Sequence, residues 1–188
     1  MIDGFFAALG VVFVAELGDK GQLLALTFAS RYSTTTVIGG LALAAVALMA
    51  LSVTTGSVLA TALPERAITI AAGVVFIGFG LWNLRAEDAE VHDGAATRRG
   101  PGVLTVAGSF AIAELGDKTM LATVALAATN GVVGTWAGAT LGMVGASSVA
   151  VVVGSQLGRR LPERPVQLAA TALFLVFGVV LLWQGLTG

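Results

Sequence analysis

Cysteine is absent from this chain of 188 residues, and histidine occurs only once. Without thiols the chain can form neither a disulfide framework nor a thiolate metal site. Charged residues are scarce at 11%, against roughly 25% in an average soluble domain. Hydrophobic residues make up 56%, and the mean hydropathy is +0.92. These values exclude an ordinary soluble domain and predict an all-α integral membrane protein embedded in a lipid bilayer.

Apolar segments long enough to cross a bilayer, which takes about 20 residues each, can be drawn six times along the chain. A single polar stretch of any length, residues 85–101, separates the third segment from the fourth and holds His92. The chain therefore divides into two halves of three spans each. The six segments are residues 4–30, 37–63, 68–84, 102–129, 132–157 and 166–186.

The two halves repeat each other at a fixed offset of 98 residues without any gap. The stretch AELGDK occurs at residues 15–20 and again at 113–118. Three spans are an odd number, so the second half must enter the membrane from the opposite side. We therefore predict six transmembrane helices as two inverted three-helix repeats, residues 1–84 and 102–188, joined by the polar linker. Transporters with such repeats build a site near the midplane, where the halves meet.

Arginines are distributed unequally between the two sides of this predicted topology. Loops on the side opposite the N-terminus hold seven arginines, whereas the N-terminal side holds only Arg66. By the positive-inside rule the arginine-rich side is cytoplasmic. We therefore expect both termini to be non-cytoplasmic and the linker to be cytoplasmic. The seven residues are Arg31, Arg85, Arg98, Arg99, Arg159, Arg160 and Arg164.

Each AELGDK motif places two acids and one lysine inside an apolar span. On a continuous helix Glu16, Asp19 and Lys20 share one face, and Glu16 with Lys20 forms an i,i+4 ion pair that neutralises part of the charge. Glu114 with Lys118 repeats this pair. Each half still keeps one acid beyond its lysine, and a charge at the bilayer centre costs about 2.5 to 3.5 kcal/mol. We therefore interpret the motifs as a functional site.

Glycines inside and outside the motif have different interpretations. Gly18 and Gly116 either mark an unwound backbone or let another helix pass closely, and the sequence does not separate these alternatives. Gly134, Gly138 and Gly142 are spaced by four residues, which favours close helix packing against a neighbouring helix or against a second subunit.

The donor atoms of the predicted site are carboxylates, which are hard oxygen ligands and suit Mg²⁺, Ca²⁺ or Mn²⁺. Four acids against two lysines leave a formal charge of minus two, which one divalent cation balances. No phosphate loop, dinucleotide-binding pattern or catalytic triad occurs, so we expect no enzyme, no bound cofactor and no nucleic-acid partner. The predicted ligands are Glu16, Asp19, Glu114 and Asp117, with Gln22 and Thr119 as polar auxiliaries and Lys20 and Lys118 as ion-pair partners in the empty site.

The duplicated Glu-x-Gly-Asp-Lys motif in a six-span chain of this size resembles the Gdt1 family of cation transporters, also called uncharacterised protein family 0016. The resemblance implies transport of Mn²⁺ or Ca²⁺ in exchange for protons, with the motif carboxylates as ligands. Bacterial members resemble manganese exporters, which implies a place in the bacterial inner membrane. The family motif usually continues with Thr or Ser. Thr119 conforms, whereas Gly21 does not, and we expect Gln22 to supply the oxygen that Gly21 lacks.

Two other functions use the same residues. A passive cation channel would use the acids without coupling the cation to protons. A small amino-acid exporter would use the lysines and acids to bind the carboxylate and the ammonium group of its substrate. Uphill metal movement driven by a proton gradient separates the exchanger from the channel. Competition between Mn²⁺ and lysine for binding separates it from the amino-acid exporter.

Overall fold

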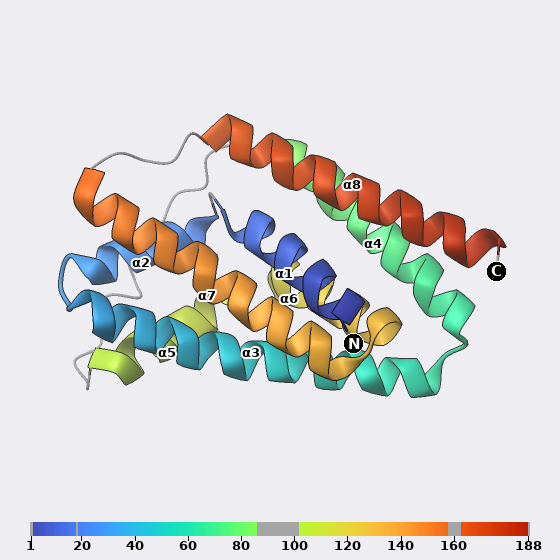
Figure 1. Cartoon of the computed structure of the whole chain (residues 1–188), viewed down its shortest axis with the longest axis horizontal. Coiled ribbons are helices and arrows are strands. Elements are labelled where there is room, and N and C mark those ends of the chain that lie inside the picture. The colour runs from blue at the N-terminus through green and yellow to red at the C-terminus, as the bar shows by residue number, and fades with distance from the viewer. Residues whose placement is uncertain (1, 18, 86–101, 158–162, 188) are drawn as a thin grey trace.

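The computed structural model describes residues 2–17, 19–85, 102–157 and 163–187, and every regular element within these ranges is a helix (Figure 1). The all-α prediction is therefore confirmed. The predicted linker falls outside the described residues except at Arg85. The helices are α1 (Ile2–Glu16), α2 (Lys20–Ala29), α3 (Thr34–Ala62), α4 (Glu65–Arg85), α5 (Gly102–Glu114), α6 (Lys118–Asn130), α7 (Val132–Leu157) and α8 (Glu163–Thr187).

Both charged motifs interrupt a helix. The predicted first span is divided into α1 and α2, and the predicted fourth span is divided into α5 and α6. The shared face and the i,i+4 pairs expected on a continuous helix therefore do not apply, because the helix is interrupted at each motif. In both copies the Asp amide donates to the carbonyl oxygen of the Glu three residues earlier, from Asp19 to Glu16 and from Asp117 to Glu114. The two interruptions thus have the same local hydrogen bond.

Local backbone chemistry explains the interruption in the second half. Gly116 has φ of +84°, a conformation that residues with a side chain rarely adopt. Asp117 follows with φ of −70° and ψ of 167°, the extended backbone of an N-cap residue. A Cβ added to Gly116 would meet open space, so this glycine serves the unwound backbone rather than close helix packing. Gly18 lies outside the described residues.

Four helices of the described residues are long and apolar enough to cross a membrane on their own: α3, α4, α7 and α8. Trp82 on α4 and Trp183 on α8 are each 70% exposed, as expected of aromatic residues that face lipid or its interface. The buried core between the helices includes the rings of Phe28, Phe76, Phe110 and Phe174.

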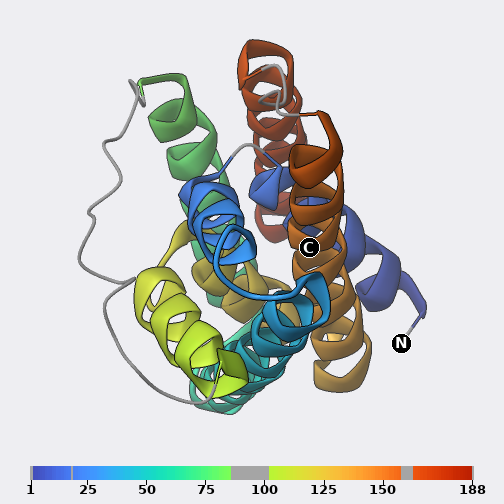
Figure 2. The ribbon, with the colours of Figure 1, turned by 90° about the vertical axis from the view of Figure 1, so that its left-hand side faces the viewer.

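Equivalent helices of the two halves make equivalent contacts. The backbone of Gly138 on α7 lies against the carbonyl oxygen of Phe5 on α1, and Gly40 on α3 lies against that of Val103 on α5. These two contacts correspond residue by residue at the offset of 98. As Figures 1 and 2 show, α1 accordingly runs along α7, and α5 runs along α3. The predicted packing role is confirmed for Gly138, and also for Gly142, which lies against the carbonyl oxygen of Leu9.

Helices α4 and α8 are themselves equivalent, and they pack together in opposite directions along one side of the molecule (Figure 1). Gly73 lies against the carbonyl oxygen of Gly178, and Gly80 lies against that of Thr171. Residue numbers thus rise along α4 as they fall along α8, so the two helices are antiparallel.

Candidate metal site

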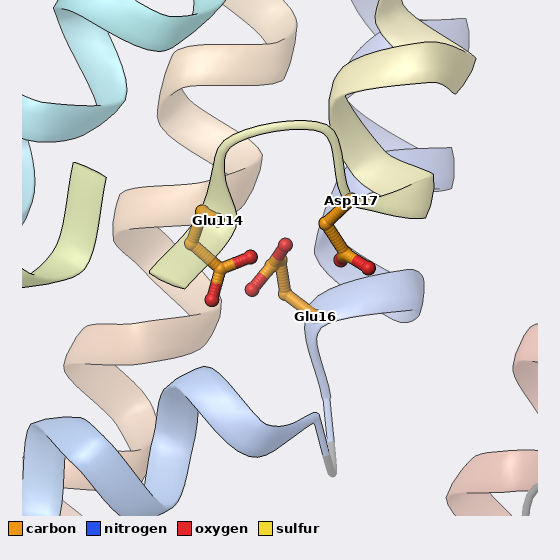
Figure 3. A group of neighbouring side chains, drawn as sticks. All are labelled: Glu16, Glu114 and Asp117. Carbon is orange, nitrogen blue, oxygen red and sulfur yellow. The ribbon is translucent and has the colours of Figure 1, made fainter. Parts of the chain in front are cut away.

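Three carboxylates from the two interruptions converge on one point. Glu16 is the last residue of α1, Glu114 is the last residue of α5, and Asp117 directly precedes α6. One carboxylate oxygen of each lies within 4.8 Å of the others. Figure 3 shows the three side chains pointing toward one another from the ends of their helices. This group, Glu16 with Glu114 and Asp117, is called the carboxylate triad below.

The spacing of the triad suits a metal ion. Three atoms no more than 4.8 Å apart lie within about 2.8 Å of a common point, whereas oxygen ligands lie about 2.0 to 2.6 Å from Mg²⁺ or Ca²⁺. Side-chain movements of a few tenths of an ångström would therefore bring all three oxygens into coordination. The donor set is entirely carboxylate oxygen, which suits hard divalent cations.

Glu16 is fixed by a hydrogen bond from the other half of the chain. The hydroxyl of Thr119, in the first turn of α6, donates to Oε1 of Glu16 at 2.6 Å. Both residues are buried, with exposed fractions of 0% for Glu16 and 1% for Thr119. The second carboxylate oxygen, Oε2, is buried without a hydrogen-bond partner. The bond therefore orients the carboxylate and leaves one oxygen for a ligand.

Asp117 also presents an oxygen without a partner. Its backbone has the conformation of an N-cap residue, but its side chain makes no capping hydrogen bond to α6. Oδ2 is buried and has no hydrogen-bond partner. Because an unpaired buried polar group costs about 1 to 3 kcal/mol, and more if it is charged, these oxygens need a cation or protons to be stable.

Asp19 lies outside the triad and is paired with a lysine of the other half. Nζ of Lys118 donates to Oδ1 of Asp19 at 2.7 Å, and the two side chains are 20% and 17% exposed. The expected i,i+4 pair of Lys118 with Glu114 is therefore replaced by a pair between the repeats, because the helix ends at Glu114 and does not carry Lys118 on the same face. The side chain of Lys20 lies outside what the structure describes.

Two other polar residues, Gln22 and Ser52, are buried but differ in their hydrogen bonds. Gln22 is buried, and its amide nitrogen has no hydrogen-bond partner. Its role as an added ligand stays a prediction. Ser52 donates to the carbonyl oxygen of Leu48 within its own helix, so its hydroxyl is occupied. The sequence pattern alone does not predict the hydrogen bond from Thr119 to Glu16 or the ion pair of Lys118 with Asp19. The repeat itself was the available signal, since transporters built from two repeats form their site where the repeats meet.

The family model described as "Divalent cation/proton antiporter GDT1" matches residues 4–90 and 102–188, nearly the whole chain in two copies. The chain belongs to this family. The resemblance inferred from the duplicated motif is confirmed, and each match covers one of the two repeats. GDT1 proteins are membrane transporters for divalent cations and not an enzyme family.

Relatives of this GDT1 chain occur in bacteria and plants. A GDT1-like protein of Synechocystis is 37% identical over 97% of this chain and 98% of its own length. A Vibrio cholerae protein named "Putative manganese exporter" is 33% identical over 92% of this chain and 86% of its own. The chloroplast protein PAM71 of Arabidopsis thaliana is 32% identical over 94% of this chain and 56% of its own. No solved structure matches.

Proposed function

We propose that this protein exports Mn²⁺ from the cytoplasm across the bacterial inner membrane in exchange for protons. Membership of the divalent cation/proton antiporter family supports the exchange. The name of the Vibrio relative supports manganese as the cation and export as the direction. The observation that carries the proposal is the carboxylate triad, which draws on both repeats and has two buried oxygens without partners.

In this proposal the triad binds the ion directly, and the neighbouring residues orient or pair with the acids before the ion binds. Thr119 orients Glu16, and Lys118 holds Asp19 while the site is empty. Asp19, which lies outside the triad, would exchange its lysine for Mn²⁺ when the ion binds and so complete the predicted set of four acids. Lys20 plays the matching role in the first motif, and Gln22 adds a neutral oxygen.

The architecture that we propose is two inverted repeats of three spans, with α1 and α2 together forming one span and α5 and α6 together forming another. Antiparallel packing of the equivalent helices α4 and α8 supports the inversion, because a two-fold axis in the membrane plane reverses the direction of a helix. The corresponding contacts of Gly138 and Gly40 support it independently. Interrupted helices that meet at the axis are typical of ion sites in such transporters.

Burial of the triad favours alternating access over an open pore. Glu16 and Glu114 are 0% and 3% exposed, so an ion cannot reach or leave them without a rearrangement. A site that opens to one side at a time couples two ligands that bind to it in turn. Because a coordinating carboxylate must be deprotonated, Mn²⁺ and protons compete for the triad. Metal moving out is thereby coupled to protons moving in.

Proteoliposomes that contain a pH-sensitive dye test the exchange. An imposed Mn²⁺ gradient should drive protons in the opposite direction at a clamped membrane potential, and Asp117→Asn should abolish both fluxes. Asp3→Asn is the matched control, since Asp3 is an exposed acid in the first turn of α1. Rapid Mn²⁺ uptake without any proton movement would instead show a passive channel. Displacement of bound Mn²⁺ by lysine would favour an amino-acid exporter.

A further inference from the structure

The two halves of the site differ directly after the shared AELGDK motif, where Gly21 and Gln22 correspond to Thr119 and Met120. Thr119 and Gly21 correspond at the offset of 98, and each lies in the first turn of the helix that follows its motif. Thr119 donates its hydroxyl to Glu16. Gly21 has no side chain, so Glu114, which corresponds to Glu16, lacks the matching hydroxyl. The two glutamates of the triad are therefore held in different ways.

The carboxylate of Glu114 occupies the space that a side chain at position 21 would need. A Cβ added to Gly21 would collide with Oε1 of Glu114 and would lie 3.1 Å from Cζ of Phe110. Gly21 and Phe110 are both buried. The Glu114 carboxylate thus packs directly against the backbone of α2 at Gly21. A Thr or Ser at this position would place its hydroxyl there, as Thr119 does in the second motif.

We propose that Gly21 is a positioning residue that sets the reach of Glu114. Its missing side chain lets the Glu114 carboxylate approach Glu16 and Asp117 closely enough to form the triad, and so sets the affinity for Mn²⁺. The inference deepens the proposed function and rests on it. A hydrogen bond from Thr119 holds Glu16, whereas Glu114 is held by its packing in the space beside Gly21. The two half-sites are therefore unequal.

A methyl group at position 21 should move the ligand without unfolding the protein. The atom it meets is the far end of a flexible side chain, which can rotate away at little cost in stability. Gly40 offers a contrast, because a Cβ there would meet the side chain of Val106 and the backbone carbonyl of Val103 at the contact between α3 and α5. A backbone atom in a packed contact cannot move aside so easily.

Titration of the purified protein with Mn²⁺ by calorimetry, together with thermal melting in the same detergent, tests this role. Gly21→Ala should weaken Mn²⁺ binding by about tenfold or more, the usual effect of disturbing residues that orient metal ligands, while the melting temperature changes little. Gly40→Ala should do the reverse, lowering the melting temperature and leaving the affinity of the folded protein unchanged.

A second substitution distinguishes positioning from general damage. Glu114→Asp retracts the carboxylate by one methylene, so it should weaken binding in the wild-type background. In the Gly21→Ala background it should relieve the collision, and the double variant should bind Mn²⁺ more tightly than Gly21→Ala alone. The same rescue should appear as recovery of folded protein if Gly21→Ala by itself folds poorly.

Two results would overturn the role of Gly21. They are an unchanged Mn²⁺ affinity in Gly21→Ala, whatever its stability, and additive effects of the two substitutions in the double variant. Each leaves the proposed function standing as long as the wild type binds Mn²⁺ and Glu16→Gln does not. A wild-type protein that binds no divalent cation would instead overturn the proposed function and this inference together.

Discussion

Thr119 donates a hydrogen bond of 2.6 Å to Glu16 across a sequence separation of 103 residues. The bond joins the start of α6 to the end of α1, so it ties the interruption of one repeat to that of the other. The ion pair of Lys118 with Asp19 spans the same junction. Two polar links between the repeats therefore converge where the carboxylate triad lies.

Replacing Thr119 by valine should weaken Mn²⁺ binding by about 10- to 100-fold, because Glu16 loses the donor that orients it. It should also lower the melting temperature of the metal-free protein, since a buried carboxylate oxygen loses its partner. Calorimetric titration and thermal melting measure both effects. Thr119→Ser keeps the hydroxyl and should retain most of the affinity.

Thr54→Val is a control for the loss of a hydroxyl elsewhere, because Thr54 is exposed on α3 and donates only to the carbonyl oxygen of Ala50 in its own helix. Its Mn²⁺ affinity should match that of the wild type. Equal losses in Thr119→Val and Thr54→Val would show that the bond to Glu16 does not orient a ligand.

Replacing Lys118 by glutamine should increase the thermal stabilisation that Mn²⁺ produces. Without its lysine, Asp19 is partly buried and unpaired, so the metal-free protein loses stability. Mn²⁺ then gains a free acid beside the triad, and ligand binding to the folded state raises its stability by mass action. Melting curves with and without Mn²⁺ measure the difference, with Lys118→Arg as the control that keeps the charge. A smaller Mn²⁺-induced shift than in the wild type would contradict the role given to the pair.

Replacing Gly138 by alanine should destabilise the protein by about 1 to 3 kcal/mol, the usual cost of overpacking. The added methyl would overlap the carbonyl oxygen of Phe5 and force α7 away from α1. Gly39→Ala is the matched control on α3, where a Cβ meets open space. It should leave stability unchanged or raise it by up to about 1 kcal/mol, because alanine favours a helix. Denaturation curves in detergent give both values, and equal effects would show that the close contact is unimportant.

Single cysteines test the predicted orientation in this cysteine-free chain. Ala95→Cys lies in the predicted cytoplasmic linker, and Thr187→Cys lies near the C-terminus. An impermeant thiol reagent applied to intact cells should label position 187 and not position 95. Labelling of position 95 alone would reverse the assignment based on the arginines. Lysed cells provide the control for accessibility, because both cysteines should react there.

The repeat made much of this arrangement predictable from the sequence. An offset of 98 residues pairs Gly40 with Gly138 and each acid with its equivalent, and the structure gives both glycines matching contacts. The interruption of the helix was harder to predict, because apolar residues continue on both sides of Gly116 and Asp117. The pair Gly-Asp does indicate such an interruption, because glycine commonly ends a helix and aspartate commonly begins one.

Partners within the site depended on packing that the sequence does not specify. Spacing along one helix pairs Glu114 with Lys118, and only the turn at Gly116 redirects that lysine toward Asp19. The position of Gly21 against Glu114 depends on the angle at which α2 meets α5, which no local pattern records. Figure 2 shows these two helices side by side at the same end of the molecule.

Binding of Mn²⁺ should release protons and should weaken as the pH falls. Three carboxylates with oxygens within 4.8 Å of one another carry a large electrostatic cost if all are ionised and no cation is present. Either Mn²⁺ or protons must therefore neutralise them, and Mn²⁺ displaces protons because a coordinating carboxylate has to be deprotonated. If one proton leaves per ion, the apparent dissociation constant should rise about tenfold for each unit that the pH falls.

Calorimetric titrations at one pH in two buffers of different ionisation enthalpy count the released protons directly. The measured heats should differ between the buffers for the wild type, and the difference should shrink in any folded Asp117→Asn protein that still binds Mn²⁺, because one titrating ligand is gone. Asp3→Asn should behave as the wild type, since this exposed acid lies in the first turn of α1, away from the triad. Equal heats in both buffers, with an affinity that stays constant between about pH 6 and pH 8, would mean that protons do not occupy the empty triad. Exchange would then need a proton carrier elsewhere in the chain, and the direct competition proposed for the triad would be wrong.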